Sequence, residues 1–318
     1  MGYFGRIIKN RGKALAQVPA NWYSNMMGYW YMYRFHRQPD CIYFLAPYGI
    51  GDTLFLAALM KAFKKENKVG RVCFIVKNSH RDLPGMFDAV DEVIVSDKMV
   101  KHLRRFALNK RKFTFANFRF GHFILDFKWP EPGRMMGVKG VTLIDVYKRA
   151  LLNLPMDSEL EPAKLFMDIR EMRPLEEQYP SDKPVAVLMP YAVTVTNLDP
   201  SFWNRIAAGL IRQGYKVYTN VTRDTEPVIE GTEPMNLSLK EFYCLASAKQ
   251  WTCVALRSGI CDLMAFSAVR MVVIHISEHS YDAWNMENLK LPNPRITEVI
   301  LDDEDQAVTV REILKQLS

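Results

Sequence analysis

The turn formed by Arg257, Ser258 and Gly259 combines the residue types best suited to bind an anion. It follows an apolar run at 251–256 and precedes an apolar-periodic stretch at 258–268, so a strand is predicted to become a helix here. Free amides at a helix start, the positive end of the helix dipole and a guanidinium all favour a phosphate or pyrophosphate. The alternative is an ordinary helix start, with Ser258 as its cap and Gly259 permitting a tight turn.

A second candidate, Gly49-Ile50-Gly51-Asp52-Thr53, follows directly after an apolar strand predicted at 41–46. The glycines Gly49 and Gly51 let the backbone approach a ligand closely. Asp52 lies at the start of the next predicted helix. Its carboxylate serves either as a general base for an acceptor hydroxyl or as a simple N-cap. The segment lacks the third glycine of a dinucleotide-binding fingerprint and the Gly-Lys-Ser/Thr of a P-loop.

Polar side chains follow two predicted strands in the C-terminal half of the chain. Their hydroxyl and amide groups suit phosphate, sugar or base oxygens and nitrogens, although an ordinary polar loop is the alternative in each case. The candidates are Thr194, Thr196, Asn197, Asn220 and Thr232. The six histidines show no paired spacing, and the absence of a Gly-x-Ser-x-Gly elbow disfavours serine hydrolase chemistry.

Strand-like and helix-like segments alternate twice along the chain. The expected strands are 41–46, 71–76, 90–95, 122–127, 185–189, 216–220, 251–256 and 271–276, and the expected helices are 52–65, 201–213, 239–248, 258–268 and 308–317. This alternation predicts an α/β protein with two doubly wound, Rossmann-like domains facing a cleft. The predicted parts are an N-terminal arm at 1–40, α/β domains at 41–155 and 184–318, and a Pro-rich, acidic linker at 156–183.

The bulk composition is that of a globular protein with an anionic partner. The chain has 318 residues, long enough for two domains, and a net charge of +7. Its five cysteines form no CxxC pair or Cys/His cluster, so reduced, mostly buried thiols and no structural metal are expected. No run of 18 apolar residues and no secretory signal are present, which favours a cytoplasmic location.

Two basic segments leave membrane contact open. Residues 1–35 interleave Lys and Arg with apolar residues and then concentrate Trp, Tyr and Met, which is the composition of an interfacial anchor or of an arm packed on the domain or a second subunit. Residues 98–112 hold seven Lys or Arg and no acid, either as a solvated surface or as a contact for an anionic acceptor or membrane phosphate. No nucleic-acid-binding motif occurs at useful spacing.

Across roughly 41–280 the chain resembles the GT-B glycosyltransferases, most closely the heptosyltransferase-like group (glycosyltransferase family nine). The segment from Gly49 to Leu59 is similar to that family's Gly-Asp segment. Ser238-Leu239-Lys240-Glu241 and Arg257-Ser258-Gly259-Ile260-Cys261-Asp262 are similar to its Ser-Leu-x-Glu helix and its Asp-Ser-Gly-x-x-His loop, which holds the donor diphosphate. Arg257 and Asp262 replace that loop's Asp and His.

The resemblance implies a transferase that moves a sugar from a nucleotide diphosphate sugar to a cell-surface glycan or lipid-linked precursor. It implies inversion, no metal and no cofactor beyond the donor substrate. Asp52 is then the base, and Ser258 and Gly259 bind the diphosphate. We expect Arg257 to stabilise leaving-group charge and Asp262 to orient Arg257 or the donor sugar. The altered pair and the aromatic N-terminus also leave open a catalytically inactive scaffold in polysaccharide assembly. Under either function, a peripheral position at the inner face of a membrane is left open.

Overall fold

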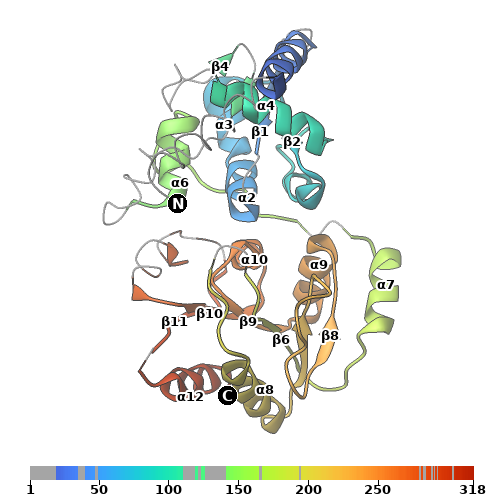
Figure 1. Cartoon of the computed structure of the whole chain (residues 1–318), viewed down its shortest axis with the longest axis vertical. Coiled ribbons are helices and arrows are strands. Elements are labelled where there is room, and N and C mark those ends of the chain that lie inside the picture. The colour runs from blue at the N-terminus through green and yellow to red at the C-terminus, as the bar shows by residue number, and fades with distance from the viewer. Residues whose placement is uncertain are drawn as a thin grey trace, which may run out of the picture.

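The computed structural model contains two parallel or mostly parallel sheets, each with helices on both faces (Figure 1). It describes residues 19–34, 40–46, 49–109, 119–120, 123–125, 141–164, 167–192, 195–278, 281, 284–287, 289, 291, 293–302 and 304–318. The predicted α/β class with doubly wound sheets is confirmed.

The N-terminal sheet has the strand order β3-β2-β1-β5-β4. Its strands are β1 (Cys41–Leu45), β2 (Arg71–Val76), β3 (Glu92–Val95), β4 (Arg119–Phe120) and β5 (Phe123–Leu125). Only the β4–β5 pair is antiparallel among the described strands of this sheet. Every residue of β1 is buried because helices cover both faces of the sheet, as parallel sheets require. The chain path reverses between β1 and β5, and such a switch point is where α/β sheets bind ligands.

The helices of this half are α2 (Ile50–Ala58), α3 (Met60–Asn67), α4 (Asp97–Asn109) and α6 (Leu143–Val146), with short turns η1 (Asn78–His80), η2 (Pro84–Met86) and η4 (Tyr147–Leu151). The single helix expected at 52–65 is divided at Leu59, whose amide donates to the Leu56 carbonyl three residues back. This tighter turn bends the chain while Phe63 still bonds to Leu59. Alternate β1 residues pack against α2 and α3 on one face and against α4 on the other.

The C-terminal sheet has the order β11-β10-β9-β6-β7-β8, with every neighbouring pair parallel. Its strands are β6 (Val185–Met189), β7 (Lys216–Asn220), β8 (Glu233–Met235), β9 (Thr252–Leu256), β10 (Arg270–His275) and β11 (Ile296–Ile300). Its helices are α7 (Ile169–Gln178), α8 (Pro200–Arg212), α9 (Leu239–Lys249), α10 (Gly259–Met264) and α12 (Gln306–Leu317). The path runs from β6 to β7 and β8 on one side and returns to β9 on the other, so β6 and β9 flank the switch point.

Several sequence expectations need correction. The linker at 156–183 stays a prediction, but the segment is not an extended loop as its prolines suggested. It contains α7, because Asp168 and Glu171 form a capping box that starts a helix despite Pro174 in its interior. The helix expected at 258–268 ends earlier, as α10, and the Ser267 hydroxyl then donates back to the Met264 carbonyl.

The five cysteines are buried, free thiols, as expected. Within the described part of the chain, no helix has the length and hydropathy of a membrane span.

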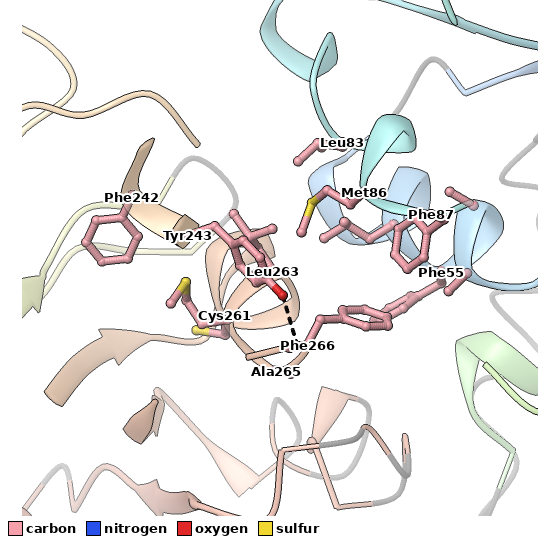
Figure 2. Packing of buried hydrophobic residues seen from close by; sticks show 14 of the residues in the cluster. Phe55, Leu83, Met86, Phe87, Phe242, Tyr243, Cys261, Leu263, Ala265 and Phe266 are labelled. Atoms are coloured by element: carbon pink, nitrogen blue, oxygen red, sulfur yellow. Dashed lines mark hydrogen bonds between the residues drawn. The ribbon is translucent and has the colours of Figure 1, made fainter. Parts of the chain in front are cut away.

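An apolar cluster joins the two halves. Figure 2 shows Phe266, which follows α10, lying against Phe55 of α2 and Phe87 of the N-terminal half. Ring centroids are 6.5 Å apart for Phe55–Phe266 and 5.4 Å for Phe87–Phe266. The Tyr243 hydroxyl donates to the Phe266 carbonyl at 3.0 Å and holds this segment in place. Continuous apolar burial therefore fixes α2 next to α10, the two helices that begin at the candidate loops.

Candidate functional site

The loops after β1 and β9 meet where α2 and α10 begin. A Cβ placed on Gly51 would lie 2.2 Å from Asp262 Oδ2, and one placed on Gly259 would lie 2.9 Å from the Ile50 Cβ. Each glycine therefore faces the start of the opposite helix, and only a residue without a side chain fits there. Two segments separated by about 200 residues in sequence form one junction at the carboxyl edges of two sheets.

Arg257 and Asp262 form a buried ion pair at this junction. The Arg257 Nη2 donates to Asp262 Oδ1 at 2.7 Å, and the two side chains are 7% and 8% exposed. Arg257 also donates from Nε to the Trp284 carbonyl at 2.7 Å and from Nη1 to the Ser258 carbonyl at 2.8 Å. Burial lowers the pKa of Arg257, but the charge and hydrogen bond of Asp262, together with the charges of Cys261 and Glu298, raise that pKa overall. The guanidinium is thus a fixed positive charge that also holds its own loop.

Ser258 and Gly259 lie beside this pair at the start of α10. Ser258 occupies the N-cap position, but its side chain makes no capping hydrogen bond. The alternative interpretation, in which the Ser258 side chain caps the helix, is therefore wrong. The interpretation in which the Ser258 and Gly259 amides bind phosphate stays a prediction.

Asp52 is a buried carboxylate, 4% exposed, in the first turn of α2. Its Oδ2 accepts from the Gly49 amide at 2.8 Å, so the capping interaction exists. Its Oδ1 accepts from the Tyr147 hydroxyl at 2.8 Å. Tyr147 lies in η4, and no sequence motif connects it with a residue 95 positions earlier. The general-base role stays a prediction, with Tyr147 as the group that orients the carboxylate.

A histidine and a lysine that sequence reasoning missed lie near Asp52. The His80 Nδ1 is 3.1 Å from the Thr53 hydroxyl, and burial followed by the nearby Lys77 charge lowers the pKa of His80 to about 4. The pKa of Lys77 is lowered by burial and by Arg104, while Asp52 acts in the opposite sense. His80 is therefore neutral near pH 7, and Asp52 shares its surroundings with one cation and one neutral imidazole.

A polar cavity of about 250 Å³ lies beyond the carboxyl ends of β6 and β7. It is lined by Tyr191, Ala192, Asn197, Thr222, Arg223, Thr225, Glu226 and Pro227. Asn197 is the one residue of this lining that the sequence analysis singled out, and its Oδ1 accepts from the Ala192 amide at 3.2 Å. Because β6 is next to β9 in the sheet, the cavity shares an edge with the Arg257 loop. Its hydroxyl, amide and charged groups suit a polar ligand such as a nucleoside.

The remaining described candidates, Asn220, Thr196 and Thr232, belong to β7 and to the loops after β6 and before β8. Thr232 donates to the Ile229 carbonyl at 2.8 Å and lies 2.5 Å from the Thr219 hydroxyl, so its side chain serves the loop's own bonding. Asn220 ends β7 half-buried and Thr196 is exposed. Thr194 lies outside the described residues. The junction therefore gathers Gly49, Gly51, Asp52, Arg257, Ser258, Gly259 and Asp262.

The mostly parallel α/β sheets agree with the GT-B type of fold found in similar solved structures. The chain is similar to the structure of Escherichia coli ADP-heptose LPS heptosyltransferase II, with a TM-score of 0.61 and 14% identity over 87% of this chain and 97% of that one. It is also similar to a family 9 glycosyl transferase from Veillonella parvula, with a TM-score of 0.56 and 13% identity over 87% and 90%.

A third similar structure is the E. coli heptosyltransferase WaaC with ADP-2-deoxy-2-fluoro heptose, at a TM-score of 0.53 and 11% identity over 87% and 100%. No protein-family model matches the chain, and no curated protein matches its sequence significantly. At these identities the similarity establishes the fold, in agreement with the resemblance carried by the sequence motifs.

Gly51→Ala tests the contact between the two loops. The added methyl group must displace the Asp262 carboxylate that Arg257 holds, so we expect the free energy of unfolding to fall by about 1–3 kcal/mol. Gly85→Ala is the matched control, because a Cβ there meets nothing within 4 Å. Urea unfolding measures both variants. Equal stability of the two variants would show that the loops do not touch.

A double-mutant cycle on Arg257 and Asp262 tests the buried pair. Arg257→Met or Asp262→Ala alone leaves an uncompensated buried charge, which costs about 3–5 kcal/mol of stability. The double variant should lose less than the sum of the singles by about 2 kcal/mol. The exposed pair Arg173–Glu177, put through the same cycle, should show coupling near zero. Additive losses at Arg257 and Asp262 would contradict the pairing.

Proposed function

We propose that the chain is a glycosyltransferase that moves a sugar from a nucleotide diphosphate sugar to a cell-surface glycan or its lipid-linked precursor. The observation that carries this proposal is the junction itself. Asp52 at the start of α2 and the Arg257–Asp262 pair at the start of α10 lie where these two helices contact each other. The similar E. coli structures described as heptosyltransferases, one of them with an ADP sugar analogue, support the substrate class.

The nucleoside and the diphosphate of the donor each have a matching feature at the carboxyl edge of the C-terminal sheet. The cavity that includes Tyr191 and Asn197 receives the nucleoside, and the Ser258 and Gly259 amides receive the diphosphate. The fixed charge of Arg257 stabilises the negative charge that develops on the leaving diphosphate, in the role that a metal ion has in other transferases. The reaction we propose is accordingly metal-independent.

The acceptor's hydroxyl would react from the side of the N-terminal sheet. Asp52 takes the proton as the acceptor oxygen forms its bond to the anomeric carbon, while the bond from that carbon to the diphosphate oxygen breaks. Attack from the face opposite the diphosphate inverts the configuration at this carbon. Tyr147 orients the carboxylate through its hydrogen bond to Oδ1.

A second candidate function is a catalytically inactive scaffold that binds partners in polysaccharide assembly. It is favoured by the state of Asp52, which is 4% exposed and has both carboxylate oxygens engaged. Under either function we place the chain in the cytoplasm, peripheral to the inner face of a membrane. Hydrolysis of a donor by the purified chain distinguishes a working catalyst from a scaffold.

A thermal-shift panel of UDP, GDP, ADP, CDP and dTDP, each with and without Mg²⁺, tests donor binding. One nucleotide diphosphate should raise the melting temperature without metal, because a ligand at 100 times its Kd stabilises the fold by about 2.7 kcal/mol. Asp52→Asn should keep this shift and abolish sugar transfer and donor hydrolysis.

Asp145→Asn is the matched control for that variant, because Asp145 occupies the same capping-box position in α6 and has no proposed chemical role. Unchanged turnover in Asp52→Asn would remove Asp52 from the mechanism. No shift from any of the five nucleotides would favour the scaffold.

A further inference from the structure

A stripe of large aromatic and apolar side chains is exposed on the helical segment 19–34. Trp22 is 68% exposed, Met26 45%, Tyr29 49% and Tyr33 60%. Positions four, seven and eleven residues after Trp22 share one side of a helix, so these side chains form a continuous row. Tyr23 and Trp30, also exposed, flank it. Single exposed apolar residues are ordinary, but a contiguous row of them marks an interaction surface.

The opposite side of this helix is anchored to α4. Tyr31 and Met32 are buried in a cluster that includes Phe106 of α4. A Cβ on Gly28 would lie 2.3 Å from the Phe106 ring, so the two helices are in close contact. The Ser24 hydroxyl lies 3.2 Å from His102 Nδ1 in a buried position. Figure 1 shows the segment, in dark blue, beside α4. The exposed row therefore stands on a fixed platform, and within it the Tyr29 ring also packs on Phe106, with the ring centroids 5.0 Å apart.

Positive charge borders the row. Lys98 and Lys101 of α4 are exposed and Arg105 is half-exposed. Lys98 and Arg105 lie four residues before and three residues after His102, so they share its side of α4. The His102 ring packs edge-to-face on Tyr23, with the ring centroids 5.1 Å apart. Burial, and then the charges of Lys98, Lys101 and Arg105, lower the pKa of His102. Arg34 adds a cation on the aromatic helix itself, with its guanidinium carbon 5.0 Å from the centre of the Trp30 ring. The surface around the row thus matches a negatively charged partner.

We propose that the helix at 19–34 and the cations of α4 together bind the surface of an anionic lipid bilayer. The helix lies in the plane of the interface, where Trp and Tyr side chains are favoured because each has an apolar body and a polar atom. Lys98, Lys101 and Arg105 contact headgroup phosphates at the same depth. This surface is separate from the junction of α2 and α10, so the proposal stands whether or not the chain transfers sugars.

Vesicle sedimentation of the full chain tests this surface, using phosphatidylcholine vesicles with and without phosphatidylglycerol. The chain should sediment with the anionic vesicles and dissociate as salt is raised. The triple variant Trp22→Ser, Met26→Ser, Tyr33→Ser should lower the partition coefficient about tenfold, because it removes the buried apolar area. The double variant Lys98→Gln, Lys101→Gln should lower it about fivefold per charge on the anionic vesicles only.

The matched control is the triple variant Met156→Ser, Ile169→Ser, Ile211→Ser, which removes exposed apolar side chains elsewhere on the molecule. It should bind vesicles like the unaltered chain, and circular dichroism should show all variants folded. Unaltered binding by the aromatic variant, or an equal loss in the control, would overturn the proposal. A further outcome would also overturn the proposal: the chain does not bind vesicles but forms a dimer, and only the aromatic variant dissociates that dimer. The row would then join two copies of the chain.

Discussion

The carboxylate of Asp262 lies between the guanidinium of Arg257 and the backbone of Gly51, and this contact fixes where the two sheets meet. Arg257 in turn donates to the carbonyls of Trp284 and Ser258, so one side chain joins its own turn to the segment at Trp284. The position of α10, and with it the loop that faces α2, depends on this network. The candidate site therefore exists only while the pair stays charged and buried.

Charge and apolar packing have different roles at this junction. Removing two charges from water costs free energy that their attraction only partly returns, so the pair specifies geometry more than it adds stability. Phe266, packed on Phe55 and Phe87, supplies the favourable burial that keeps the halves together. Glycines at positions 51 and 259 let the charged and apolar contacts form at the same time, because side chains there would separate the helices.

The sequence predicted the parallel-sheet strands well because buried strands are continuous apolar runs, as in β1 and β6. It missed β8, which is only three residues long, and β11, which has no fully apolar run. It also treated the prolines around α7 as a linker, although a capping box starts a helix there. The Arg257–Asp262 pair could be expected from the sequence, because the two residues are five positions apart. The hydrogen bond from Tyr147 to Asp52 could not, because only the fold brings these distant segments together.

Hydrogen exchange of the full chain, measured by mass spectrometry with and without each nucleoside diphosphate, tests most directly whether the junction is the binding site. One nucleotide should slow exchange in four segments together: the start of α2, the start of α10, the loop after β6 and the loop after β7. Slowing at the C-terminal loops alone would separate the nucleotide site from Asp52. No slowing at the junction with any nucleotide would contradict the account.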